Sequence, residues 1–441
     1  MESDAEEQTS ILGTPEKVKQ SPAGVARTHP MLAPSKPGLE FSLKPFSPNE
    51  TFAAISMSRV RLIQQPVHTP LRSPLGRAFR REPTLKISRR FVLSLLAAFV
   101  AAASYAQSTP ASALLVLSKQ DHTLAIVDPQ TLKAVARVPV GDDPHEVIAS
   151  SDGRTAYVSN YGFGALHTLT VVDLVGQKRE KVIDLGALRG PHGLAFVGGK
   201  VWFTAEAAKA IGSYDPVADR IDWIMGTGQD RTHMLYVFPD ARRILTTNVS
   251  SATVTILDKT ERPAGMPPGP PPGMPQGGPP PGMPPGPPPS PPGGNWEETV
   301  IPVGRGSEGF DVTPDRREAW VANAGDGTIS VIDLASKRVV DTIPANARGA
   351  NRLKFTPDGK LALVSAGSAL VILDAATRRE VKRLGDVHAS GGIQIQPDGA
   401  RAYAACGREG DVAVIDLKTL EAVGHIDAGG GPDGLAWAVR Q

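Results

Sequence analysis

Three histidines, His145, His192 and His233, stand at similar intervals along the sequence, each at the start of a short apolar run. Imidazole side chains can bind transition metals, move protons near neutral pH or hydrogen-bond a polar ligand. Three imidazoles brought together could therefore form a metal site or a binding site for a small molecule. For the three to meet, the chain between them must return to the same place once per interval.

An internal repeat provides such a return. Seven short apolar runs each end on an aspartate, at Asp128, Asp173, Asp215, Asp258, Asp333, Asp374 and Asp416. The intervals are 45, 42, 43, 75, 41 and 42 residues, and the longest contains segment 263–294, with 17 prolines and 9 glycines. A period near 42 residues with four short strands per unit is typical of propeller blades. The sequence thus predicts an all-β, seven-bladed β-propeller over residues 107–441.

The two ends of the repeat region complement each other. Runs 113–118, 123–128 and 134–140 can supply a second, third and fourth strand without a first, whereas run 433–439 supplies a first strand alone. Pairing them would close the ring and leave no free sheet edge. We therefore expect the last blade to be built from N- and C-terminal strands together.

Propeller geometry groups the candidate site residues. The first strand of each blade lines the central channel, so the residues at its start surround the channel mouth. The predicted ligand site comprises His145, His192, His233, Glu308, Asn351 and Asp433. Residues at or near the second-to-third loops of the same face could form a rim, or could serve mostly as turn residues: Tyr161, Glu206, Asn248, Asn323 and Arg408. An alternative is that the histidines only cap entry turns inherited through blade duplication.

Two classes of function remain open. The first is a binding or scaffold propeller for a small-molecule or protein ligand, which the lack of a G-x-S-x-G or P-loop motif in residues 107–441 favours. The second is a metal-dependent lyase or lactonase-type enzyme. In that alternative a divalent transition metal, with His145, His192 and His233 as candidate ligands, polarises the substrate. No motif decides whether the chain is an enzyme or needs a cofactor.

The second strands carry a recurring motif that resembles a known family. The sequences YVSN, LTTN and WVAN resemble the YVTN-type β-propeller repeat of exported bacterial and archaeal proteins; they stand at 157–160, 245–248 and 320–323, with Pro-Asp-Gly turns at Pro357 and Pro397. The resemblance spans about residues 113–441 and implies an exported seven-bladed propeller with no single shared activity. The turn at 191–193, Pro-His-Gly, also resembles virginiamycin B lyase propellers, which use histidine and a divalent cation.

The first 106 residues have the features of a targeting region. Lys86, Arg89 and Arg90 precede the apolar run 91–103, and small residues follow, which predicts a signal peptide over 86–106 cleaved after Ala106. The twin-arginine pathway and ordinary export are both open. Residues 1–85 are either a disordered extension or the product of a misassigned start codon. We expect a periplasmic or secreted protein without stable membrane insertion, because the apolar run is shorter than the roughly 20 residues of a membrane span.

The charge distribution argues against a nucleic-acid partner. The first 106 residues hold 14 of the 47 Lys and Arg and 8 of the 45 Asp and Glu, so the remainder carries a net charge of −4. A nucleic-acid binder needs a basic surface. The single cysteine, Cys406, excludes an intramolecular disulfide. Segment 263–294 is expected to be disordered and to act as a spacer or as a binding site for a partner.

Overall fold

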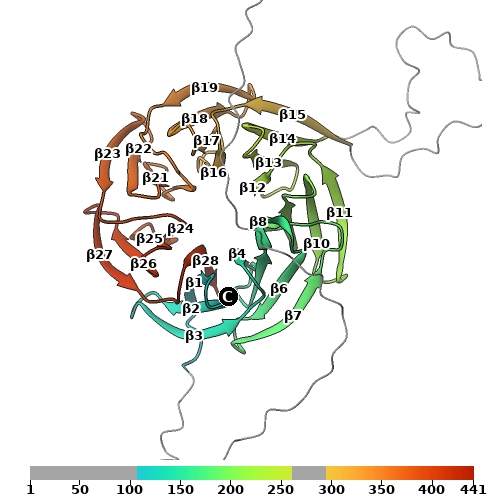
Figure 1. The fold of residues 1–441 in the computed structure, drawn as a ribbon, viewed down its shortest axis with the longest axis vertical. Helices are drawn as coiled ribbons and strands as arrows, with labels where there is room; N and C mark the ends of the chain where they lie inside the picture. Colours follow the sequence, from blue (N-terminus) through green and yellow to red (C-terminus); the bar gives the residue numbers. More distant parts are fainter. Residues whose placement is uncertain (1–106, 261–294) are drawn as a thin grey trace, which may run out of the picture. The chain divides into compact units, whose positions relative to one another are not determined.

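The computed structural model describes residues 107–260 and 295–441, which form seven four-stranded antiparallel sheets arranged as blades around a central axis (Figure 1). The predicted all-β, seven-bladed propeller is confirmed. The expected extension 1–85, signal peptide 86–106 and proline-rich segment 263–294 lie outside the described residues. In the part of the chain that is described, no helix is long and apolar enough to cross a membrane.

Each blade runs from an inner strand at the axis to an outer strand at the rim. The first four blades in chain order are β4 (Pro144–Ala149), β5 (Thr155–Asn160), β6 (Thr168–Asp173) and β7 (Lys178–Asp184); β8 (Pro191–Val197), β9 (Lys200–Ala205), β10 (Ala210–Asp215) and β11 (Arg220–Gly226); β12 (Thr232–Val237), β13 (Arg243–Asn248), β14 (Thr253–Thr260) and β15 (Asn295–Pro302); and β16 (Ser307–Val312), β17 (Glu318–Asn323), β18 (Thr328–Asp333) and β19 (Arg338–Ile343). The other three are β20 (Arg352–Phe355), β21 (Leu361–Ser365), β22 (Leu370–Asp374) and β23 (Arg379–Leu384); β24 (Ile393–Ile395), β25 (Arg401–Cys406), β26 (Asp411–Asp416) and β27 (Glu421–Ile426); and β28 (Pro432–Val439) with β1 (Ser112–Ser118), β2 (Thr123–Asp128) and β3 (Lys133–Pro139).

The last of these blades contains both ends of the described chain. The order in its sheet is β28-β1-β2-β3, so the C-terminal strand is the inner strand. Leu114 pairs with Trp437 and Leu115 with Ala436. This pairing confirms the predicted closure of the ring by N- and C-terminal strands.

The aspartate that ends most third strands shapes the turn to the fourth. The Asp173 Oδ1 atom accepts backbone N–H groups of Val175 and Gly176 at 3.0 and 2.9 Å. The same type of turn is formed by Asp128, Asp215, Asp333, Asp374 and Asp416. A side-chain turn of this kind satisfies backbone donors that the ladder leaves free. The repeated aspartate therefore belongs to the turns and not to the axial site.

The core lies between the blades. Seven clusters of buried side chains each join two neighbouring blades; in one of them Leu169 and Val171 of β6 pack with Phe203 and Ala205 of β9. The middle strands are buried because a neighbouring blade covers each face, whereas the outer strands expose alternate residues. This packing fixes the inner strands relative to one another, and with them the residues at the axis.

Candidate functional site

The inner strands β4, β8 and β12 follow one another around the axis (Figure 1), and each carries a histidine as its second residue. The ring centroids of His145 on β4 and His192 on β8 are 4.3 Å apart, and those of His192 and His233 on β12 are 3.7 Å apart. His192 is fully buried, His233 is nearly so, and His145 is partly exposed. We call these three neighbouring imidazoles the histidine row.

His233 lies between two carboxylates. Its Nδ1 atom is 3.3 Å from Oε1 of Glu206, and its Nε2 atom makes an ion pair with Oε2 of Glu308 at 2.7 Å without hydrogen-bond alignment. Burial disfavours the charged form, but the two carboxylates outweigh it and raise the pKa of His233 above its ordinary value. Burial also opposes ionisation of Glu206, yet hydrogen bonds from His233 and Tyr161 and the charge of Arg231 lower its pKa to about 2. The two carboxylates therefore favour the protonated form of His233.

His192 has the opposite character. Neither of its ring nitrogens has a hydrogen-bond partner among the described residues, although the residue is 0% exposed. Burial, together with the charges of His233 and His145, lowers the pKa of His192 well below its ordinary value. The imidazole is therefore neutral at pH 7, with one nitrogen that can donate a hydrogen bond and one that can accept. Buried polar atoms nearly always have partners, so His192 is equipped to receive a polar group.

Two carboxylates, those of Asp143 and Asp433, lie beside His145 at the other end of the histidine row. The Nδ1 atom of His145 lies 3.6 Å from Asp433 Oδ2 and 4.0 Å from Asp143 Oδ1. Lys119 Nζ bridges the two carboxylates, at 2.9 Å from Asp433 and 3.7 Å from Asp143. The neighbouring His145 and the charge of Lys119 lower the pKa of Asp143 to about 2 against the effect of burial. The pKa of Asp433 is also lowered, because His145 and Lys119 outweigh its burial.

Arg352 on β20 connects Asn351 to Glu146 on β4. Its guanidinium donates to the carboxylate of Glu146 on β4, and its Nη1 atom donates to Asn351 Oδ1 at 2.6 Å. Arg352 is 4% exposed, so this pair is shielded from solvent. Asn351 thus joins the cluster through Arg352.

Tyr161 and its loop form part of the rim. The Tyr161 ring centroid is 4.8 Å from that of His145 and 5.2 Å from that of His192, and its hydroxyl donates to Glu206. Burial and the contact with Glu206 raise the pKa of Tyr161, which stays protonated. Two residues on, within the short helix η1 (Gly162–Gly164), Phe163 is 92% exposed with a φ of 51°. The rim therefore offers aromatic faces beside the polar cluster.

Hydroxyls of the second strands position the site backbone. Thr204 on β9 accepts the Gly193 N–H at 2.9 Å and donates to the carbonyl oxygen of His233 at 2.5 Å. In the same way Thr247 on β13 accepts the Met234 N–H at 3.3 Å and donates to the carbonyl oxygen of Glu308 at 2.7 Å. Both hydroxyls occupy the third place of the repeated second-strand motif. In these two blades the motif hydroxyl therefore ties the inner strand to the axial residue of the next blade.

Glycine follows the axial residue where inner strands approach most closely. Such glycines are Gly193, Gly309, Gly392 and Gly434. A Cβ atom on Gly193 would lie 2.7 Å from the carbonyl oxygen of His233, and one on Gly434 would lie 2.5 Å from that of His145. No side chain fits there, because backbone cannot move aside as a flexible side chain can. The Pro-His-Gly turn is thus explained by packing between neighbouring strands.

The structure brings all the predicted site residues into one cluster, which we call the axial cluster. Its predicted members are His145, His192, His233, Glu308, Asn351 and Asp433. Sequence reasoning missed Lys119, Asp143, Glu146, Arg231 and Arg352, and had placed Tyr161 and Glu206 only on the rim. A signal existed for some of these. Asp143, Glu146 and Arg352 each stand within two residues of a predicted axial position, where a charge at the start of an inner strand is unusual for a buried strand.

The geometry of the histidine row is not that of a formed metal centre. Within residues 107–260 and 295–441, no group of three or more His, Cys, Asp or Glu side chains is arranged to hold a metal ion. The rings of His145 and His192 meet edge to face and those of His192 and His233 are tilted by 38°, whereas metal ligands must direct nitrogen lone pairs to one point. The metal site expected at His145, His192 and His233 stays a prediction.

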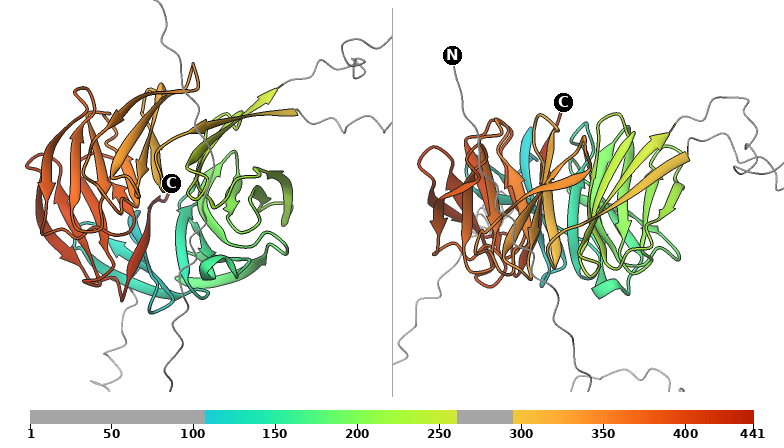
Figure 2. Two further views of the ribbon diagram at one scale, coloured as in Figure 1. Left: turned by 45° about the horizontal axis from the view of Figure 1, so that its top comes forward. Right: turned by 90° about the horizontal axis from the view of Figure 1, so that it is seen from above.

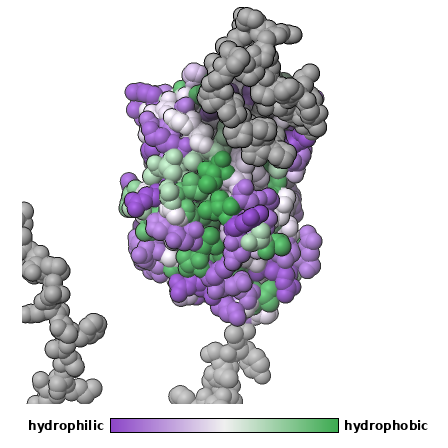
Figure 3. Space-filling view, turned by 90° about the vertical axis from the view of Figure 1, so that its right-hand side faces the viewer, coloured by the Kyte–Doolittle hydropathy of each residue, from purple (hydrophilic) through white to green (hydrophobic). Residues whose placement is uncertain are grey.

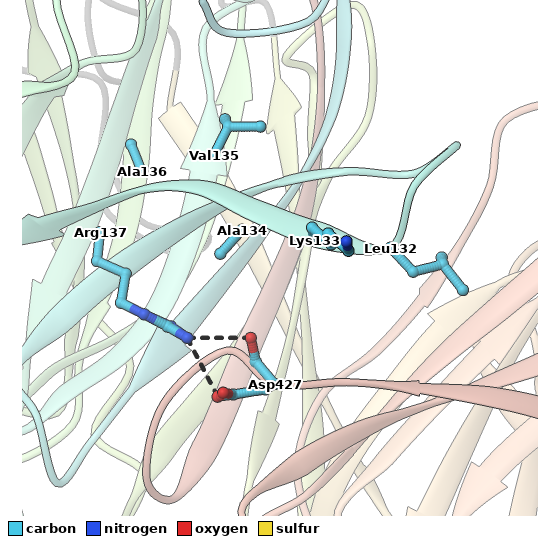
Figure 4. Close-up of a pocket in the computed structure, with 7 residues that line it drawn as sticks. All are labelled: Leu132, Lys133, Ala134, Val135, Ala136, Arg137 and Asp427. Carbon is cyan, nitrogen blue, oxygen red and sulfur yellow. Dashed lines mark hydrogen bonds and ion pairs between the residues drawn. The ribbon is translucent and has the colours of Figure 1, made fainter. Parts of the chain in front are cut away.

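A depression lies away from the axis, on the outer strand β3 (Figure 4). Arg137 in this strand donates through Nη2 to both the carbonyl oxygen and Oδ1 of Asp427, which follows β27, each at 3.1 Å. The pair joins two neighbouring blades and is well exposed to solvent. Exposed ion pairs of this kind contribute little to stability. Among the other residues that line this depression, Leu132 to Ala136, Lys133 alone carries a charge.

Comparisons with known proteins identify the architecture. No family model matches the sequence, and no curated protein matches it. A solved structure from Bacteroides uniformis ATCC 8492, provisionally assigned as a 6-phosphogluconolactonase, is 15% identical and has a TM-score of 0.58; the match covers 74% of this chain and 99% of that one. A protein of unknown function from Desulfotomaculum acetoxidans DSM 771 is 13% identical, with a TM-score of 0.57 and coverage of 75% and 99%.

A third match is the hydrazine synthase of Kuenenia stuttgartiensis, 17% identical, with a TM-score of 0.54 and coverage of 70% of this chain and 93% of that one. These likenesses show the fold alone. At such identities the neighbours, whether of unknown function or lactonase-like, share a β-propeller with this chain. The resemblance to the YVTN-type repeat stays a prediction.

Proposed function

We propose that this chain is a binding propeller whose axial cluster takes a small, neutral, hydroxyl-rich ligand. The observation that carries the proposal is His192, a neutral and fully buried imidazole whose two nitrogens have no partner among the described residues. An unpaired buried polar group costs about 1 to 3 kcal/mol. A ligand hydroxyl can remove that cost, because it can donate to one nitrogen or accept from the other.

The charge balance of the axial cluster favours a neutral ligand. Four cationic groups, Lys119, Arg231, His233 and Arg352, stand against five carboxylates, Asp143, Glu146, Glu206, Glu308 and Asp433. Each already has an oppositely charged neighbour within 4 Å. A strongly charged ligand would have to break such pairs, and separating a buried pair is costly. The exposed ring of Phe163 offers an apolar face on which the carbon side of a sugar-like molecule can lie.

The histidines themselves provide the test. The ring nitrogens of the full chain can be followed by NMR during titration with glucose, glucono-1,5-lactone and glycerol. We expect shifts at His145, His192 and His233. The control signals are the surface histidines His122, His167, His388 and His425, each paired with a carboxylate away from the axis. Equal shifts at surface and axial histidines, or a stronger axial response to citrate or spermidine, would contradict the proposal.

A second candidate, lactone hydrolysis, is favoured by the contact between His192 and His233. One imidazole is neutral and the other is cationic, so a base and an acid lie side by side. In this role His192 accepts a proton from the water that attacks the lactone carbonyl. The ring C–O bond breaks, His233 donates a proton to the leaving oxygen, and a hydroxy acid results. Hydrolysis of glucono-1,5-lactone above the uncatalysed rate, lost in His192→Leu, would support this candidate.

The metal-assisted form of this alternative has its own test. It predicts one equivalent of a transition metal in the full chain purified without a His tag, and loss of that metal when His145, His192 and His233 are all replaced by alanine. The binding proposal predicts the same metal content in both proteins. Elemental analysis of the pair separates the two.

We place this binding role in the periplasm or outside the cell. The support is the sequence of residues 86–106, in which basic residues precede an apolar run and small residues. Fractionation of the source cells, with N-terminal sequencing of the protein, tests the assignment. A chain that begins after Ala106 is expected, and a cytosolic chain that retains residues 86–106 would contradict it.

A further inference from the structure

An aromatic cluster at the outer edge of two blades takes no part in the axial site. Trp202 lies on β9, Trp223 on β11 and Trp296 on β15, and these are three of the five tryptophans in the sequence. The ring centroids of Trp202 and Trp223 are 5.4 Å apart, and those of Trp223 and Trp296 are 5.3 Å apart. Trp202 is buried, whereas Trp223 and Trp296 are partly exposed to solvent.

Trp223 departs from the repeat. It pairs with Ser213 next to a β-bulge that recurs in the outer strands of most blades. At the corresponding position the other bulged outer strands carry Ala136, Lys181, Asp341, Lys382 and Gly424. None of these is aromatic or large and apolar. The blade architecture therefore does not by itself require a tryptophan here.

Trp296 belongs to an extension found in only one of the described blades. Elsewhere the outer hairpin turns at the aspartate that ends the third strand, but β14 and β15 continue past Asp258. Two further pairs follow, Lys259 with Trp296 and Thr260 with Asn295. The extended hairpin projects from the body of the propeller (Figure 2). The extension is what places Trp296 against Trp223.

The proline-rich segment begins and ends at this hairpin. Residues 261–294 join Thr260 to Asn295, so the segment returns to the chain one residue before Trp296. The sequence GMPPGPPP occurs twice, at 265–272 and 282–289, and GMPQGGPPP stands between them at 273–281. No charged residue occurs in 263–294. Proline-rich sequences favour the polyproline II helix, which other proteins bind with exposed aromatic side chains.

We propose that Trp223 and Trp296 form a docking surface for the GMPPGPPP repeats of the same chain. The tether keeps the repeats at an effective concentration in the millimolar range, so even weak contacts with the indole rings are populated. An uncharged segment also suits the surroundings: apolar side chains gather on this side of the molecule (Figure 3), and Val182, Ile224 and Val300 are exposed on the outer strands β7, β11 and β15. The surface thus binds a polyproline sequence on the outside of the two blades, against the indole rings.

NMR of the tryptophan indole N–H groups tests the proposal. The full chain is compared with a variant that lacks residues 263–292 and keeps Gly293 and Gly294 as the turn. We expect the Trp223 signal to move in the variant and to return toward its original position when a peptide of sequence 265–289 is added at millimolar concentration. The buried Trp320 serves as the unaffected control. A Trp223 signal that is the same in both proteins and ignores the peptide would overturn the proposal.

Three controls separate docking from other causes. A peptide in which alanine replaces every proline should leave the Trp223 signal unmoved, because it lacks the polyproline II preference. The response to the proline peptide should be the same at 50 and 500 mM salt, because no charges are involved; a strong salt dependence would count against the proposal. The Trp223 signal of the full chain should not depend on protein concentration. A dependence would mean that the repeats dock on a second copy, which would overturn docking within one chain.

Discussion

The imidazole of His192 stacks on that of His233 with ring centroids 3.7 Å apart, and the two rings differ in charge. Carboxylates of Glu206 and Glu308 raise the pKa of His233, whereas burial and the neighbouring cation lower the pKa of His192. The site therefore holds side by side one imidazole flanked by two carboxylates and one neutral imidazole without a hydrogen-bond partner among the described residues. The central claim is that the unpaired imidazole is there for a ligand.

Replacing His192 by leucine should leave the protein at least as stable as the wild type. The change removes two unpartnered nitrogens and keeps an apolar side chain of similar size, so the free energy of unfolding should stay the same or rise by about 1 kcal/mol. Urea unfolding measures the difference. A structural histidine would instead lose about 2 kcal/mol or more on replacement, and that result would count against a ligand role for His192.

The hydroxyl of Thr204 should matter more than that of Thr246. Thr204→Val leaves the Gly193 N–H and the His233 carbonyl oxygen without their partner, and we expect a loss of about 2 kcal/mol in the free energy of unfolding. Thr246→Val is the matched control, because this hydroxyl is buried without a partner and its removal should be neutral or stabilising. Equal losses in the two variants would show that the hydroxyl bridge does not hold the inner strands together.

A methyl group on Gly193 should separate two inner strands. Its Cβ atom would lie 2.7 Å from the carbonyl oxygen of His233, so Gly193→Ala should lower the unfolding free energy by about 2 kcal/mol and shift the His233 resonances. Gly226 also lies in a strand but has open space around it, and Gly226→Ala should be neutral or slightly stabilising. Thermal unfolding of the two variants and the wild type makes the comparison.

The free energy of unfolding should fall as the pH drops below 6.5, and His192 should cause part of that fall. Its pKa is lower in the folded than in the unfolded protein, so its contribution is present above the ordinary value of 6.5 and is lost as the pH falls below 6.5. The loss approaches about 1.4 kcal/mol per pH unit. His233, whose pKa is raised, works in the opposite direction: its contribution is present below 6.5 and is lost as the pH rises above that value.

The variant His192→Leu shows how much of the stability loss below pH 6.5 is due to His192. Between pH 6.5 and 5.5 the wild type should lose about 1 kcal/mol more of its unfolding free energy than the variant does. The carboxylates of Asp143 and Glu206 do not interfere, because each has a pKa of about 2, far below this window. Parallel losses in the two proteins would show that His192 does not titrate as its burial requires.

The regular part of the molecule could be predicted from the sequence. The strand period, with an aspartate at the end of each third strand, and the closure of the ring by N- and C-terminal strands follow from a pattern that recurs from blade to blade. The position of the histidines at the axis followed from their register in the inner strands. Structural features that recur in each blade can therefore be predicted from one sequence.

The charges around the histidines could not be predicted in the same way. Arg352 meets Glu146 across 206 residues of sequence, and the pairing depends on how blades far apart in the chain close into a ring. Trp223 and Trp296 meet only because one hairpin is longer than its counterparts. Contacts between elements that depart from the repeat have no recurring sequence pattern. Only the three-dimensional structure shows them.

Crystals of the full chain soaked with a library of small neutral hydroxyl-rich molecules would show directly whether His192 binds a ligand. Bound molecules should gather at the axial cluster, with a hydroxyl within hydrogen-bond distance of His192 and with contacts to Tyr161 or Phe163. The same soaks of His192→Leu crystals should leave that place unbound. Molecules found only at other surfaces, in crystals whose axial end is open to solvent, would contradict the account.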